Sequence, residues 1–146
     1  LGGAIYVVSR DLISICHCTF ENNNAVNGSS LYAKVGHANG KDTNDRITIF
    51  GNTFTIAPTV EKSTNVYIES IKLDENIEPR AVVYFGNNKF AHESTLSHFS
   101  LFVDDQGQLK DFVFIGYNCI QSGLDTVHIP NTVNGVEQYI IMYVLM

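Results

Sequence analysis

The chain has 146 residues, a formal net charge of −6 and nine lysine and arginine residues in total. This length suits one domain, and the scarcity of basic residues argues against nucleic acid or an anionic membrane surface as the main partner. Apolar residues make up 45% of the chain, which is enough for a sizeable core, and the abundance of glycine and asparagine is typical of turns and corners. No apolar run reaches the roughly 18 residues that a membrane-spanning helix needs.

The first 24 residues hold the unit around which the chain is organised. A glycine pair at 2–3 precedes an apolar strand at 5–7, a turn and a second strand at 13–15, and the unit closes on residues 19–23. Short runs with apolar residues at every second position predict strands, and no helical periodicity lasts for ten residues anywhere in the chain. The sequence therefore predicts an all-β protein.

A second feature is the repetition of the 13–20 segment at regular intervals. Apolar residues with the same offsets of zero, two and seven begin at positions 13, 47, 83 and 113, so successive copies are 34, 36 and 30 residues apart. Offset five is asparagine in three of the four copies. The four residues at that offset are Cys18, Asn52, Asn88 and Asn118. A period of this length is the mark of a solenoid, in which each coil packs on the next.

Between these copies lies a weaker repeat that reads apolar, aromatic, apolar. Its members are Ile5-Tyr6-Val7, Leu31-Tyr32-Ala33, Val66-Tyr67-Ile68, Leu101-Phe102-Val103 and, with histidine at the centre, Val127-His128-Ile129. Each period is therefore expected to hold two short strands separated by polar corners.

We expect equivalent strands of successive coils to lie side by side in parallel, about 4.8 Å apart. Two interior stacks follow, with an asparagine at each corner that can bond along the solenoid axis. The predicted stacks are Ile15, Ile49, Phe85, Ile115 and Phe20, Phe54, Phe90, Ile120. The fold-level alternative is a β-sandwich or jelly roll, which requires hairpins and antiparallel pairs.

Two short motifs carry a family resemblance. GGAI at 2–5 and FENN at 20–23 resemble the paired GGA[ILV] and FxxN motifs of the polymorphic outer membrane protein repeat, and Gly28-Ser29-Ser30-Leu31 resembles a degraded second GGAI. The resemblance covers both motifs only in the first 25 or so residues. It implies a right-handed, single-stranded parallel β-helix of the pectin-lyase-like kind, displayed at a cell surface or secreted, with adhesin or passenger functions and no catalytic residues.

The organisation expected from these patterns is one β-helix segment over 1–146 with about four to five coils. Polar insertions near 36–45, 72–80 and 104–110 recur at one position in the coil and would project from one face. We see no polar capping coil, so we expect a piece of a longer solenoid. The apolar segment 139–146 is read as the last strand, with a truncated membrane segment or a truncated reading frame as alternatives, and membrane attachment would need sequence beyond this chain.

Candidate metal and disulfide sites are weak. Cys16-His17-Cys18 lacks the two-to-four-residue spacing of a zinc pair and a second pair, so we expect Cys18 to face inward as a small apolar residue. Cys119 lies three coils away from Cys18, or some 14 Å at the spacing of stacked strands, which is too far for a disulfide. A calcium site at Asp104-Asp105, or at Asp42 and Asp45, lacks a spaced series of acidic residues. We therefore predict neither a metal nor a cofactor.

A catalytic alternative comes from the paired carboxylates Asp104 and Asp105. Together with His37 and Arg46 they invite comparison with the polygalacturonases, which share the right-handed β-helix and carry NTD, DD, GHG and RIK elements in that order. Here His37 and Arg46 precede the aspartates, and the NTD and RIK elements are missing. Paired carboxylates without a placed partner are usually a solvated turn.

The leading hypothesis is a non-catalytic extracellular or cell-surface scaffold that binds a host, matrix or carbohydrate surface. A polysaccharide lyase or hydrolase, or a fragment of one, is the rival, and a degenerate reading frame is a third possibility. Asn27, in Asn27-Gly28-Ser29, is the only N-glycosylation sequon. The histidines at 17, 92, 98 and 128 are read as surface residues.

Overall fold

The computed structural model describes residues 3–8, 12–35, 46–56, 63–70, 81–92, 98–106, 109–116, 118–120, 127–129, 134–137 and 140–141. All regular secondary structure in these ranges is β-strand. The described residues contain no helix that is long and apolar enough to cross a membrane.

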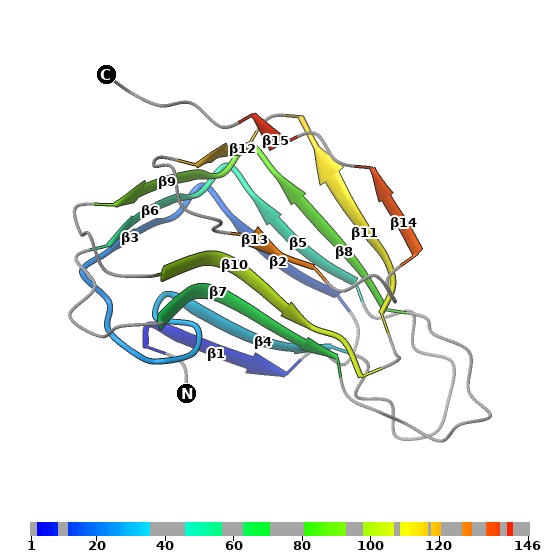
Figure 1. Cartoon of the computed structure of the whole chain (residues 1–146), viewed down its shortest axis with the longest axis horizontal. Coiled ribbons are helices and arrows are strands. Elements are labelled where there is room, and N and C mark those ends of the chain that lie inside the picture. The colour runs from blue at the N-terminus through cyan, green and yellow to red at the C-terminus, as the bar shows by residue number, and fades with distance from the viewer. Residues whose placement is uncertain are drawn as a thin grey trace.

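In the described ranges, fifteen strands form three parallel sheets, which Figure 1 separates clearly. Sheet A consists of β1 (Ile5–Val8), β4 (Leu31–Val35), β7 (Ser63–Ser70), β10 (His98–Asp104) and β13 (Val127–His128). Sheet B consists of β2 (Leu12–Cys16), β5 (Arg46–Phe50), β8 (Ala81–Gly86), β11 (Leu109–Ile115) and β14 (Asn134–Glu137). Sheet C consists of β3 (Thr19–Glu21), β6 (Thr53–Ile56), β9 (Lys89–His92), β12 (Asn118–Ile120) and β15 (Ile140–Ile141).

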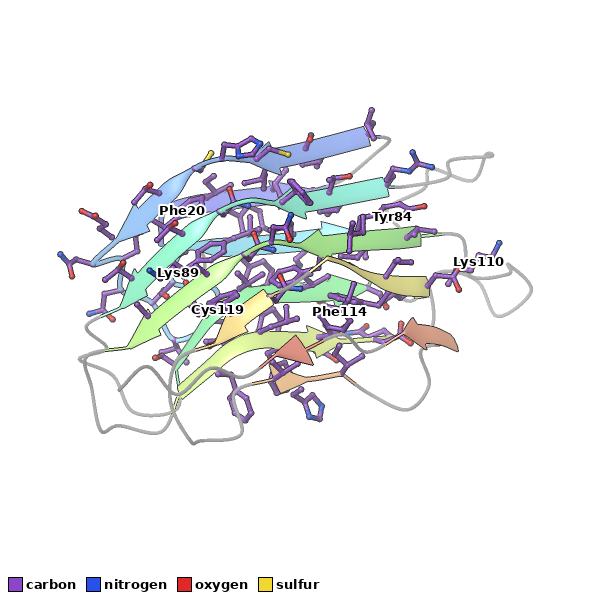
Figure 2. All side chains as sticks on the ribbon, turned by 90° about the horizontal axis from the view of Figure 1, so that it is seen from above. Phe20, Tyr84, Lys89, Lys110, Phe114 and Cys119 are labelled. Carbon is purple, nitrogen blue, oxygen red and sulfur yellow. The ribbon has the colours of Figure 1, made fainter. Side chains whose placement is uncertain are left out.

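Each coil contributes one strand to each sheet in chain order, and every strand pair among the described residues is parallel. The predicted all-β fold with parallel coil-to-coil stacking is therefore confirmed. The antiparallel pairs of the sandwich alternative are not found in this part of the chain. Figure 2 shows the strands of successive coils stacked in layers.

The expectation of two strands per coil is wrong, because each coil holds three. The 13–20 segment and its copies bend at the asparagine corner, so that one half joins sheet B and the other joins sheet C. At the bend, His17, Gly51, Asn87 and Gly116 have positive φ angles of 55°, 68°, 49° and 63°. This left-handed backbone turns the chain between the two sheets.

The interior is built from the side chains that alternate inward from the three sheets. In sheet B, Ile15 pairs with Ile49 and Ile49 with Phe85, as predicted. In sheet C, Phe20 pairs with Phe54, Phe54 with Phe90, and Phe90 with Ile120. The three phenylalanine rings stack with centroids 5.0 and 4.7 Å apart.

The fourth member of the sheet B stack is Phe114, and the prediction of Ile115 is wrong. Phe85 pairs with Phe114, whereas Ile115 pairs with Gly86 and is 39% exposed. The register of β11 shifts between Leu109 and Asp111, so β11 has one more residue there than β8; the extra residue, Lys110, is exposed at one end of the strand (Figure 2). A one-residue shift exchanges the two faces of a strand. It buries Phe112 and Phe114, which remove more apolar surface from water than Val113 and Ile115 would.

The predicted correspondence between the two glycine motifs is confirmed by backbone pairing. The amides of Gly3, Ala4 and Ile5 donate to the carbonyls of Gly28, Ser29 and Ser30 at 3.0, 3.2 and 3.0 Å. A Cβ atom on Gly3 would lie 2.0 Å from the carbonyl oxygen of Ser29. Only glycine allows the two backbones to approach so closely.

Four predicted segments fall partly or wholly outside the described residues. The insertions near 36–45 and 72–80 lie wholly outside, and residues 107–108 of the third insertion are also outside. Of 139–146, the structure describes Ile140–Ile141, which form β15 and pair with β12.

Candidate binding surface

The outward face of sheet A carries a continuous column of aromatic side chains, which we call the aromatic ladder. Its members occupy equivalent positions in all five coils and are Tyr6, Tyr32, Tyr67, Phe102 and His128. Successive ring centroids lie 5.3, 4.9, 5.4 and 4.5 Å apart, with interplanar angles of 28°, 18°, 6° and 19°. The ladder arises because the parallel register places the central residue of each apolar–aromatic–apolar triplet directly beside the next.

Stacking covers the ring faces and leaves mainly ring edges and polar tips accessible. Tyr32, which has a ring on either side, is 4% exposed, whereas Tyr6 in the first coil has one described neighbour and is 51% exposed. Aromatic pairs of this kind contribute about 0.5–1.5 kcal/mol each beyond their area burial. The ladder therefore stiffens sheet A, and its more exposed members present ring edges on the outward face.

A charged row runs parallel to the ladder, two residues further along each strand. Lys34 pairs with Glu69, and Glu69 pairs with Asp104. The ammonium Nζ of Lys34 lies 3.3 Å from Oε2 of Glu69. Two cross-links join the rows diagonally: the hydroxyl of Tyr32 donates to Oε2 of Glu69 at 2.5 Å, and the hydroxyl of Tyr67 donates to Oδ2 of Asp104 at 3.0 Å.

These carboxylates alter the acidity of the two tyrosines. Burial, followed by the hydrogen bond to Asp104 and the negative charges of Asp104 and Glu69, raises the pKa of Tyr67 from 10.0 to about 12. Burial and the contact with Glu69 likewise raise the pKa of Tyr32 well above its ordinary value. Both hydroxyls therefore stay protonated and act as donors at neutral pH.

Comparisons with protein-family models, curated proteins and solved structures find no match to this chain.

The two aspartates considered as a catalytic pair have different surroundings. Asp104 lies on the outward face of sheet A and accepts from Tyr67. Asp105 lies at the corner after β10, where its Oδ1 accepts from the hydroxyl of Ser70 at 2.5 Å and from the amide of Leu109 at 3.3 Å. Arg46 is on sheet B with its guanidinium 5.1 Å from the ring centre of Tyr84, and His37 is outside the described residues.

The metal-site candidates that lie within the described residues are not assembled either. Within the described ranges, no group of three or more histidine, cysteine, aspartate or glutamate side chains could hold a metal ion. Asp42 and Asp45 lie outside these ranges. Cys16, Cys18 and Cys119 are free thiols.

The expectation that Cys18 faces inward is wrong, because its side chain is exposed. Cys18 belongs to the first coil, on whose far side no described strand lies, so the position that buries asparagine in later coils is open here. Its amide nevertheless takes part in the asparagine column by donating to Oδ1 of Asn52 at 2.9 Å. The predicted glycosylation site, Asn27, is half-buried in the segment between β3 and β4.

The predicted surface location of the histidines is confirmed at two of the four positions. His17 and His128 are exposed, His17 at the corner between β2 and β3 and His128 on the ladder. The side chains of His92 and His98 are not among the described ones.

The repeated triplets predict the members of the ladder as strand residues but not as a surface, and the charged row was not predicted. The spacing of the residues nevertheless carries a signal for it. Each hydrogen-bonded tyrosine is followed 37 residues later by its acid, so Tyr32 precedes Glu69 and Tyr67 precedes Asp104 by one coil plus two residues.

Proposed function

We propose that this chain is a non-catalytic, right-handed parallel β-helix segment that acts as a rigid display scaffold outside the cell or at its surface. Its binding face is the outward side of sheet A, and its partner is a host, matrix or carbohydrate surface. The observation that carries the proposal is the unbroken ladder beside the charged row: the parallel register repeats the ladder through five coils and places Lys34, Glu69 and Asp104 beside it in the middle three.

The chemistry of this face suits a polar ligand rich in hydroxyl groups or a polar protein surface. Glu69 and Asp104 supply acceptors, Lys34 supplies a donor, and the tyrosine edges supply rigid contact area. Tyrosine is favoured at recognition surfaces because it combines an apolar ring with a hydroxyl group and loses little side-chain entropy. A repeating surface also suits a repeating ligand such as a polysaccharide.

Two arguments support the handedness and the cellular location. Parallel crossover connections are right-handed in about 98% of cases, because right-handed strand twist favours that path. The GGAI and FENN motifs resemble those of surface-displayed β-helices, and the backbone pairing of Gly3 explains why the motif needs glycine. Adhesion and surface location rest on this resemblance.

The rival is a polysaccharide lyase or hydrolase that uses Glu69 and Asp104, which are partners on neighbouring strands of the outward face. Both carboxylates accept a tyrosine hydroxyl, and Glu69 is also paired with Lys34. Carboxylates held by these hydrogen bonds and this ion pair are better suited to maintain the shape of a surface than to exchange protons with a substrate. We therefore favour binding over catalysis.

The decisive experiment is to screen the purified chain on glycan and extracellular-matrix arrays, with Glu69→Gln, Lys34→Ala and Tyr67→Ala as test variants. Tyr84→Ala is the matched control, because Tyr84 is a partly exposed tyrosine on the outward face of sheet B. We expect about tenfold weaker binding for the test variants and unchanged binding for the control. No binding to any array component, or equal loss in the control, would contradict the proposal. Turnover of an acidic polysaccharide that Glu69→Gln abolishes would establish the rival.

A further inference from the structure

Three consecutive members of the aromatic ladder are tyrosines, and the pair in the second and third coils is the more closely stacked. The rings of Tyr32 and Tyr67 have centroids 4.9 Å apart and an interplanar angle of 18°, on strands β4 and β7 that lie side by side (Figure 1). On the other side of Tyr67 the next ring is Phe102, which has no hydroxyl group. Within the ladder, Tyr67 therefore has Tyr32 as its tyrosine neighbour.

The hydroxyl group of each of these two tyrosines already donates to a carboxylate. Tyr32 donates to Oε2 of Glu69 at 2.5 Å, and Tyr67 donates to Oδ2 of Asp104 at 3.0 Å. A base can take a proton when it lies within hydrogen-bond reach of that proton. Because Tyr32 is 4% exposed, bulk water has little access to it, and the carboxylate of Glu69 is the base in place. Both phenols are thus arranged to lose a proton together with an electron.

The neighbouring pair, Tyr6 and Tyr32, provides a comparison within the same ladder. Its ring centroids are 5.3 Å apart at an angle of 28°, so the two rings are also stacked. The position diagonal to Tyr6, which corresponds to that of Glu69 relative to Tyr32, holds Lys34. A lysine ammonium group has donors only and cannot take a proton. The two pairs are therefore alike in proximity but differ in the presence of a proton acceptor for each hydroxyl group.

We propose that Tyr32 and Tyr67 are a modification site, at which a one-electron oxidant such as a peroxidase supplied with hydrogen peroxide forms a dityrosine cross-link between the second and third coils. Each side chain gives one electron to the oxidant and its hydroxyl proton to its carboxylate, Glu69 or Asp104. The two radicals then join through the ring carbons next to their hydroxyl groups. Each joined carbon loses its hydrogen as a proton, and both hydroxyl groups are restored.

The complete reaction forms one carbon–carbon bond and breaks two ring carbon–hydrogen bonds. It removes two electrons and two protons from the protein, and one molecule of hydrogen peroxide takes them up to become two molecules of water. A bond between residues 32 and 67 restricts the unfolded chain as a disulfide does, so the cross-linked protein should resist unfolding better. The reaction requires no ligand on sheet A, so it is independent of the proposed binding function.

The experiment is oxidation of the whole chain at low concentration by a peroxidase and hydrogen peroxide, after the free thiols have been alkylated. Dityrosine fluorescence follows the rate, and peptide mapping by mass spectrometry locates the cross-link. We expect a monomer whose mass is lower by two hydrogen atoms, with Tyr32 joined to Tyr67 and a higher urea midpoint of unfolding. In the chain unfolded by urea, the preference for this pair should disappear.

Glu69→Gln and Asp104→Asn are the test variants, because an amide keeps the shape of the carboxylate but does not take the proton. Each should lower the initial rate of cross-linking at least about tenfold. Tyr84→Phe is the matched control, since Tyr84 is a partly exposed tyrosine on sheet B, and its cross-linking rate should equal that of the wild type.

The mapping of the wild-type protein needs no substitution, so it gives a result even if a variant folds poorly. A cross-link found mainly between Tyr6 and Tyr32, dityrosine formed only between molecules, or no dityrosine at all would overturn the assignment of the site. Equal rates in the wild type and both amide variants would overturn the role of the carboxylates as proton acceptors.

Discussion

The side-chain amide of Asn52 donates to Oδ1 of Asn88 one coil away, at 3.1 Å, and the backbone amide of Asn52 donates to the same oxygen at 3.1 Å. Asn88 repeats the arrangement with Asn118, at 3.3 Å from its side chain and 3.1 Å from its backbone. All three asparagines are 1% exposed. The predicted asparagine column therefore exists. It provides side-chain acceptors for the backbone amides of Asn52 and Asn88 at the buried corner between sheets B and C.

Asn88→Ala should destabilise the chain strongly. Asn88 also donates to the carbonyl of Ile49 at 2.9 Å, so Asn88→Ala removes that hydrogen bond and takes the side-chain acceptor away from the buried backbone amide of Asn52. An unsatisfied buried group costs about 1–3 kcal/mol and a lost hydrogen bond about 1 kcal/mol, so we expect a loss of about 3 kcal/mol in the free energy of unfolding, measured by urea denaturation. Asn87→Gly is the control: Asn87 is exposed with φ of 49°, where glycine is unstrained. Equal losses in both variants would contradict the assignment.

Phe54→Ala should cost about 3–5 kcal/mol, because Phe54 is fully buried between Phe20 and Phe90. Phe54→Leu keeps most of the apolar volume and should cost less than half as much. Phe50→Ala provides the comparison, since Phe50 is a partly exposed phenylalanine on the outward face of the neighbouring strand. Thermal and urea unfolding would rank the three variants, and a Phe50 effect as large as that of Phe54 would be inconsistent with the stack.

Spacing alone predicted the parallel stacking, because like residues recur at one coil per period. It did not predict the third strand, since residues 13–20 read as one segment and a bend at the asparagine leaves the inward residues at the same offsets. Spacing also gave the wrong inward residue in the fourth coil. In the other coils the inward residue of sheet B lies three residues before the corner position, which would be Ile115 before Asn118. The fourth coil has one additional residue at each end of this segment, so Phe114 faces inward and Asn118 still aligns with Asn88.

For a related reason, the sequence predicts only part of the candidate surface. The ladder lies within triplets that can be read from the sequence, whereas the pairing of Tyr32 with Glu69 depends on the length of the coil that separates them. The length of each coil changes with its insertions, so a diagonal contact between two coils can be predicted only when the register of their strands is known. Asp104 and Asp105 are adjacent in sequence, but their side chains take different partners, Tyr67 and Ser70, because Asp104 is the last residue of β10 and Asp105 lies at the corner after it.

Gly51→Val should destabilise the chain by at least about 1–2 kcal/mol, because Gly51 has φ of 68° and a Cβ there would lie 2.7 Å from Nδ1 of His17. Gly51→Asn should cost less, since asparagine tolerates this backbone and occupies the equivalent position as Asn87. Adding His17→Ala removes the steric contribution only. If Gly51→Val and Gly51→Asn unfold at the same urea concentration, backbone strain at this corner is not the cause.

Alkaline pH should weaken the fold through the ladder tyrosines. The pKa of Tyr67 is about 12 in the folded chain against 10.0 ordinarily, so folding favours the protonated hydroxyl. The resulting stabilisation is fully present below pH 10.0 and is lost as the pH rises through 10.0 toward about 12. Urea unfolding at a series of pH values should show this decline, and tyrosinate absorbance should show a late-titrating fraction.

Tyr67→Phe removes that ionisation together with the hydrogen bond to Asp104. It should lower stability at neutral pH by about 1 kcal/mol and make the decline above pH 10.0 shallower. Tyr84→Phe is the matched control, because Tyr84 is a partly exposed tyrosine on sheet B, outside the ladder. A decline as steep in Tyr67→Phe as in the wild type would separate the alkaline effect from the ladder and assign it to tyrosines elsewhere. A shallower decline in Tyr67→Phe alone would show that ionisation of Tyr67 destabilises the stacked coils at alkaline pH.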